Sequence, residues 1–109
     1  MNFYEYDAAV MRTAGPATTR HDALALSALG LAGESGEFAD MIKKHLYHGH
    51  PLSMEKYVEE LGDILWYLSR ACDAVVISLH DVAEANIAKL QLRYPEGFST
   101  ERSINRGDT

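Results

Sequence analysis

The stretch GLAGESGEFAD, from Gly30 to Asp40, decides the fold because it stands in the middle of a long helical pattern. Apolar side chains recur at helical spacing before, within and after it, at Leu24, Ala28, Leu31, Phe38, Ile42 and Leu46. The stretch also contains three glycines at a spacing of three, although a glycine destabilises a helix interior by about 0.8–1 kcal/mol relative to alanine. Gly30, Gly33 and Gly36 therefore indicate that a second helix or a ligand closely approaches this backbone.

Helix-capping residues divide the rest of the chain into further helices, and no segment shows the pattern of a strand. The helix through the glycines is expected to begin after Thr19 and to continue to about Tyr47, where Gly49 and Pro51 end it. The other expected helices run over residues 2–13, from a cap at Ser53 to about Val75, and from a cap at Ser78 to Arg93. Residues 96–109 are polar and are expected to be irregular.

Long helices with short connections predict an all-α fold, an antiparallel four-helix bundle that forms a single domain over residues 1–109. Three long helices and one short helix make a thin bundle, so we expect a homodimer or homotetramer to complete the core. Cys72 lies within an apolar helical stripe and is expected to be a buried core residue.

The charge and the hydropathy pattern exclude several classes of function. A net charge of −6 without a basic stripe argues against binding to a nucleic-acid backbone. The N-terminal segment MNFYEYDAAV has no basic region followed by an apolar run, and no apolar run approaches the roughly 20 residues of a membrane span. We therefore expect a cytoplasmic protein that binds neither nucleic acid nor membrane.

Two pairs of acidic residues, each spaced by one helical turn, form the candidate site. Glu34 and Glu37 lie among the glycines, and Glu60 and Asp63 repeat the spacing in EELGD. Each pair borders the apolar stripe of its helix, so the pairs converge if the two helices pack through these stripes. Like charges at this spacing destabilise a helix. No basic side chain offsets these charges from four residues further on, because those positions hold Phe38, Met41, Ile64 and Tyr67.

Four carboxylates without counter-charges indicate a bound cation, and ordinary surface acids are the alternative for either pair alone. Ligands that are all oxygens favour a hard ion, Mg²⁺ or Mn²⁺. A helical di-iron site is not indicated, because no glutamate has a histidine three residues later. Zinc at His45, His48 and His50 is less favoured than helix capping, since these histidines cluster at a helix end.

A basic line on the last long helix is the candidate phosphate-binding element. Asn86, Lys89 and Arg93 stand at i, i+3 and i+7 in NIAKLQLRYP, on one helix face. Two cations and an amide suit a polyphosphate held by a metal ion, and a solvated basic face near a helix C-terminus is the alternative. Tyr67 shares the face of the second acidic pair, where its hydroxyl can reach the site.

Together these motifs resemble the MazG-like nucleotide pyrophosphohydrolases of the all-α NTP pyrophosphatase superfamily, which also includes the dimeric dUTPases. The family signature is an ExxE pair followed by an ExxD pair, separated here by the 22 residues from Phe38 to Glu59. The surrounding segments GLAGESGE, KKHLYHGH, EELGDILWYL and NIAKLQLRYPEGFS are also similar to the family. The resemblance covers roughly residues 20–99.

The resemblance implies Mg²⁺-dependent hydrolysis of a nucleoside triphosphate to the monophosphate and pyrophosphate, an activity suited to removing surplus or non-standard nucleotides. The residues it implies are the metal ligands Glu34, Glu37, Glu60 and Asp63, the phosphate clamp Lys89 and Arg93, and the substrate contact Asn86. Water attacks the α-phosphorus in such a reaction, and we favour Glu37 as the carboxylate that accepts its proton. The alternative is a non-catalytic helical module that binds metal and nucleotide without turnover.

Overall fold

Helices make up most of the structure. The computed structural model describes residues 1–16 and 19–106. Within these ranges lie five helices, α1 (Phe3–Met11), α2 (Arg20–Tyr47), α3 (Met54–Ala74), α4 (Leu79–Arg93) and α5 (Thr100–Ile104). No strand occurs among the described residues, so the expected all-α class is confirmed.

The helix ends lie where the capping residues predict them. Ser78 and Asp81 bond reciprocally at the start of α4, each side chain accepting the backbone N–H of the other residue at 3.1 Å. At the end of α2, Gly49 is left-handed (φ 73°), and the N–H of His50 returns to the carbonyl of Lys44 at 3.1 Å. The other two predicted N-caps are present as well, at Thr19 and Ser53.

The tail differs from the sequence prediction. The prediction of irregular structure over residues 96–109 is wrong for residues 100–104, which form α5. The hydroxyl oxygen of Ser99 accepts the N–H of Arg102 at 3.0 Å, and its carbonyl accepts the N–H of Ser103 at 3.0 Å. A local N-cap is therefore enough to start a helical turn in a polar segment. Residues 107–109 lie outside the described residues.

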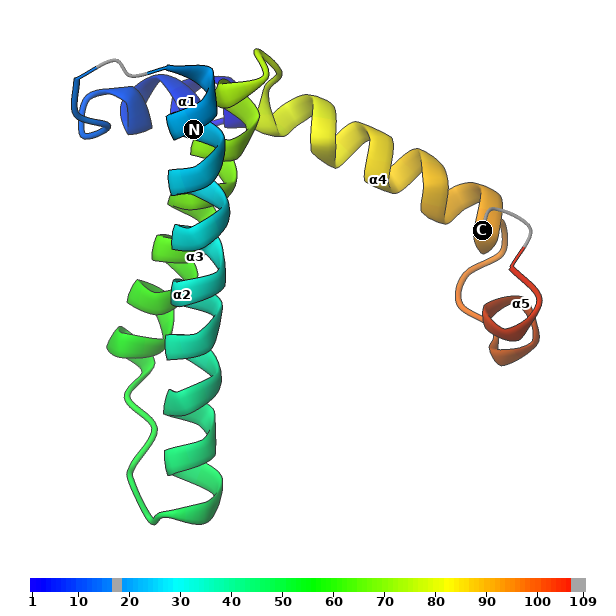
Figure 1. The fold of residues 1–109 in the computed structure, drawn as a ribbon. Coiled ribbons are helices and arrows are strands. Elements are labelled where there is room, and N and C mark those ends of the chain that lie inside the picture. The colour runs from blue at the N-terminus through cyan, green and yellow to red at the C-terminus, as the bar shows by residue number, and fades with distance from the viewer. Residues whose placement is uncertain (17–18, 107–109) are drawn as a thin grey trace.

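The helices are arranged around one hairpin (Figure 1). α2 and α3 run antiparallel, and α1 crosses the end of this hairpin where α2 begins. α4 leaves the hairpin at the same end and extends away from it, with α5 at its far end. The radius of gyration is 17.1 Å, whereas a compact chain of this length has about 13 Å. The expected four-helix core is thus not closed within one chain.

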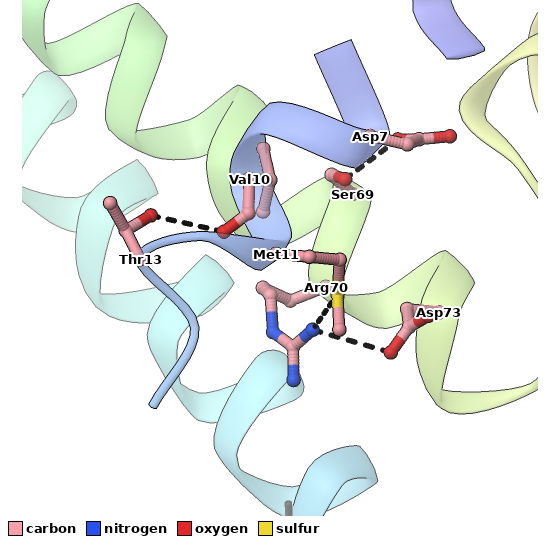
Figure 2. A network of polar contacts seen from close by, with 7 residues as sticks. All are labelled: Asp7, Val10, Met11, Thr13, Ser69, Arg70 and Asp73. Carbon is pink, nitrogen blue, oxygen red and sulfur yellow. Dashed lines mark hydrogen bonds and ion pairs between the residues drawn. The ribbon is translucent and has the colours of Figure 1, made fainter. Parts of the chain in front are cut away.

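Asp7 on α1 joins three helices at this end of the hairpin. One of its carboxylate oxygens accepts the hydroxyl of Ser69 on α3 at 2.7 Å, and the other accepts the N–H of Leu79 at the start of α4 at 3.1 Å. Figure 2 shows this region, where Arg70 of α3 also donates to the sulfur of Met11 at 2.9 Å. A carboxylate at a helix N-terminus is favourable, so Asp7 fixes both α1 and the start of α4 on α3.

Little apolar surface is buried in the chain. Among the described residues, the buried apolar side chains are Val10, Cys72 and Leu79, which confirms the expectation for Cys72. The accessible surface is 8086 Å². A folded monomer of this mass exposes about 6,000 Å², which leaves an excess of roughly 2,000 Å². Large apolar side chains lie in this surface, with Leu29 73% exposed and Leu92 80% exposed. None of the helices among the described residues combines the length and the apolar character needed to span a bilayer.

The three glycines of α2 differ in their surroundings. A Cβ atom at Gly30 would collide with the edge of the Tyr67 ring from α3. The space around the corresponding positions at Gly33 and Gly36 is open to 4 Å. Close helix packing therefore explains Gly30, but no packing among the described residues explains Gly33 or Gly36.

The contact at Gly30 can be tested by urea unfolding. We expect Gly30→Ala to lower the free energy of unfolding by about 1–3 kcal/mol, because the new methyl group overpacks the interface with Tyr67. Gly62→Ala is the matched control, since Gly62 lies inside α3 with open space around its Cβ position. This control should be neutral or should stabilise by up to about 1 kcal/mol. Equal effects of the two substitutions would show that Tyr67 does not pack on Gly30.

Candidate active site

The hairpin brings three of the four predicted carboxylates together. Glu34 and Glu37 project from α2 and Glu60 from α3, and one oxygen of each lies within 4.8 Å of the others. Asp63 stands beside this carboxylate cluster (Glu34, Glu37 and Glu60) and shares a hollow with Glu34. The convergence predicted from the stripe borders is therefore observed, with Asp63 adjacent to the cluster.

Two oxygens of the cluster lack hydrogen-bond partners. Oε2 of Glu34 and Oε2 of Glu60 are shielded from solvent and accept no hydrogen bond from any described residue. Desolvation, followed by the charge of Glu37, raises the pKa of Glu34. The same two causes, in the same order, raise the pKa of Glu60. Shielded anionic oxygens without a donor are suited to a cation.

The counter-charges that the chain supplies lie mostly outside the cluster. Hydrogen bonds from Lys44, at 2.9 Å, and from Lys43, at 3.2 Å, lower the pKa of Asp40. Lys56, one turn before Glu60 on α3, opposes the rise in the pKa of Glu60 without reversing it. The donor set of the cluster is all carboxylate oxygen, which fits a hard divalent ion such as Mg²⁺ or Mn²⁺.

Aromatic side chains border the cluster towards α1. Tyr67 lines the hollow that holds Glu34 and Asp63, as its predicted position on the helix requires. Trp66 packs edge-on against Tyr67, with ring centroids 4.9 Å apart, and its Nε1 donates to the hydroxyl oxygen of Thr13 at 2.9 Å. Sequence reasoning missed Thr13, because nothing local indicates that the end of the first helix reaches the site.

Two cavities flank the cluster along the hairpin. The aromatic cavity, of about 380 Å³, lies towards α1 and is lined mainly by apolar groups that include Leu26, Trp66 and Tyr67. The hairpin-end cavity, of about 280 Å³, lies towards the loop between α2 and α3. Its polar lining is made by three acids, two lysines and two neutral groups, namely Glu37, Asp40, Glu60, Lys44, Lys56, His50 and Ser53. Sequence reasoning missed Lys56, although its position one turn before Glu60 was a usable signal.

The histidines near the hairpin loop form no metal site among the described residues. Nδ1 of His45 lies 2.8 Å from the carbonyl oxygen of His50, so this ring can donate a hydrogen bond that closes the helix end. The expectation of a capping role thus has a structural basis for His45.

The predicted basic line lies apart from the cluster within one chain. Asn86, Lys89 and Arg93 are on α4, which extends away from the hairpin (Figure 1). None of the three lines the hollow beside Glu34 or either of the two cavities along the hairpin.

Comparison with known proteins identifies a family and a relative. Residues 23–98 match the family described as MazG nucleotide pyrophosphohydrolase domain. The chain is also similar to the protein named Gene 37 protein of Mycobacterium phage L5, with 30% identity over 89 residues. This similarity covers 78% of each of the two chains. No solved structure matches the chain significantly.

The raised pKa values give a test by thermal unfolding. In metal-free protein, Glu34 and Glu60 bind protons more tightly in the folded state than in the unfolded chain. This contribution to stability is present below the ordinary value of 4.5 and is lost as the pH rises through the raised pKa values. We therefore expect Glu60→Gln to raise the melting temperature of metal-free protein at neutral pH, and to change it little near about pH 4.

In the presence of Mg²⁺ at neutral pH, the wild-type protein should have the higher melting temperature of the two. The wild-type protein should gain stability because the ion binds the folded state, and Glu60→Gln should gain much less. A Mg²⁺ response that survives unchanged in Glu60→Gln would contradict the assignment of Glu60 as a ligand.

Proposed function

Because this chain belongs to the MazG nucleotide pyrophosphohydrolase family, we propose that it hydrolyses nucleoside triphosphates to the monophosphate and pyrophosphate. The observation that carries the proposal is the carboxylate cluster, with its two shielded oxygens that lack hydrogen-bond partners. Residues 1–109 act as one MazG-like domain in this proposal, since Asp7 ties α1, α3 and α4 together.

The metal site of the proposed enzyme is made by Glu34, Glu37 and Glu60, with Asp63 beside them. Mg²⁺, with Mn²⁺ as the alternative, would neutralise the phosphates and increase the acidity of the attacking water. Glu34 and Glu60 each keep a shielded oxygen that suits ion binding, whereas Glu37 is the exposed member of the cluster.

Glu37 is accordingly the proposed general base. A new bond forms between the water oxygen and the α-phosphorus, and the bond from the α-phosphorus to the bridging oxygen breaks. Pyrophosphate leaves with the electrons of that bond, and Glu37 accepts the proton of the water. As the exposed member of the ligand set, Glu37 can reach the water with an oxygen that does not hold the ion, and can pass the proton to solvent.

The basic line on α4 completes the site from a second copy of the chain. Within one chain, Lys89 and Arg93 lie apart from the carboxylates. The excess surface of roughly 2,000 Å² per chain matches the size of an obligate homodimer interface. We therefore place Asn86, Lys89 and Arg93 of one subunit over the carboxylates of another, where the two cations bind phosphate. A homotetramer fulfils the same requirement.

The activity can be tested with a panel of nucleoside triphosphates and Mg²⁺, with the products separated by anion exchange. Monophosphate and pyrophosphate are the expected products. Glu60→Gln and Asp63→Asn should fold normally and lose turnover by roughly a hundredfold or more. Glu59→Gln is the matched control, because Glu59 is an exposed neighbour outside the cluster and should keep full turnover.

The outcome separates the proposal from its alternatives. Diphosphate and orthophosphate as products would contradict attack at the α-phosphorus. Nucleotide binding without turnover, with Mn²⁺ also tried, would identify a non-catalytic binding module. Near wild-type turnover in Glu60→Gln would overturn the metal site.

Subunit mixing tests whether α4 acts on the neighbouring site. Glu60→Gln and Lys89→Gln are each expected to be inactive as purified oligomers. If Lys89 acts between the subunits of a dimer, mixed dimers contain one intact site. An equal mixture should then recover about a quarter of wild-type turnover after the subunits exchange. No recovery, with exchange verified by native mass spectrometry, would place Lys89 in its own chain's site.

A further inference from the structure

The proposed reaction leaves the hairpin-end cavity without an assigned occupant. We propose that the hairpin-end cavity binds the β- and γ-phosphates of the substrate, and then the pyrophosphate product, through Lys44 and Lys56 of the same chain. This inference rests on the proposed function, because it names the place of the leaving group at the same site.

The hairpin-end cavity lies next to the carboxylate cluster, where the leaving group has to be bound. The hairpin-end cavity includes Glu37 and Glu60 in its own lining, so it opens directly onto the carboxylate cluster. Lys56 precedes Glu60 by four residues, which is about 6 Å along the helix. Lys44 follows Glu37 by seven residues, which is about 10 Å. The two ammonium groups therefore extend the line of the cluster towards the loop, over a length suited to a diphosphate.

The hairpin-end cavity also contains positive charges that can bind phosphate. Lys56 acts on Glu60 through its charge but forms no ion pair with any described residue, so its ammonium group is available to an anion. Lys44 shares Asp40 with Lys43, which holds the ammonium group of Lys44 at the cavity and leaves it donors to spare. α3 also begins at this cavity, with its N-cap Ser53 in the lining, and a helix N-terminus adds partial positive charge.

The contrast with the other end of the hairpin sets the direction of the substrate. The aromatic cavity offers Leu26, Trp66 and Tyr67, which suit the face of a nucleobase. The guanidinium group of Arg70 also lines it, but this group already pairs with Asp73 at 3.3 Å and donates to the sulfur of Met11. With the base there and the α-phosphate at the carboxylates, the remaining phosphates point towards the loop. The leaving group thus enters the cavity that contains the lysines.

Lys43 provides a control for the simpler explanation, in which the lysines only balance nearby acids. Lys43 and Lys44 both pair with Asp40, but only Lys44 lines the cavity. A role in charge balance predicts similar effects for the two, whereas a role in phosphate binding predicts an effect for Lys44 alone. Lys56→Gln removes the other cation of the proposed site.

The experiment measures pyrophosphate binding by calorimetry in the presence of Mg²⁺, for wild type, Lys44→Gln, Lys56→Gln and Lys43→Gln. We expect wild type and Lys43→Gln to bind equally, and the other two variants to bind roughly tenfold or more weakly. In steady-state assays, the same two variants should raise the inhibition constant of pyrophosphate and the KM of the triphosphate. Inhibition by the monophosphate should not change, because this product has no β- or γ-phosphate.

Each contrary result overturns the inference. Absence of pyrophosphate binding to wild type would do so even if turnover is observed, and the proposed function would then stand. Equal effects of Lys43→Gln and Lys44→Gln would show that these lysines only balance the charge of nearby acids. Parallel loss of monophosphate inhibition would show that the substitutions disturb the carboxylate cluster. The calorimetry requires no turnover, so a failure of the proposed function would be seen separately.

Discussion

The contact between the ring of Tyr67 and the backbone of Gly30 sets how closely α2 and α3 approach, and the carboxylate cluster depends on that approach. The cluster itself repels, because it holds acidic groups from both helices within 4.8 Å. A second contact lies on the loop side, where Phe38 packs edge-on against Tyr57 with ring centroids 5.2 Å apart. Aromatic packing on both sides of the cluster therefore holds the two helices together against the repulsion between their charges.

The parts of the structure that local chemistry determines were predictable from the sequence. Helix ends follow from capping side chains and from Gly49, which act within a few residues of their own position. The carboxylate pairs follow from helical periodicity, since their place on the stripe border fixes their place on the interface. Tyr67 was predictable for the same reason, because it shares the face of Glu60 and Asp63.

The direction of α4 was not predictable, because it depends on one unusual turn. Val76 adopts φ 60°, a conformation that a β-branched residue rarely takes and that no sequence pattern signals. The N–H of Ile77 then returns to the carbonyl of Cys72 at 3.0 Å, and Asp7 holds the next turn from a distant part of the chain. The position of Lys89 and Arg93 relative to the carboxylates follows from this turn, so spacing on α4 alone could establish their common face but not their site.

Gly33 and Gly36 of α2 bear on whether one chain forms the complete site. Gly33 and Gly36 each destabilise α2, and no described residue packs close enough to their Cα atoms to offset this cost. A second copy of the chain that approaches α2 closely would explain both glycines. The exposed apolar surface and the separation of α4 from the carboxylates also indicate that one chain alone does not form the complete core or the complete site. All three are accounted for if the functional unit contains more than one copy of this chain.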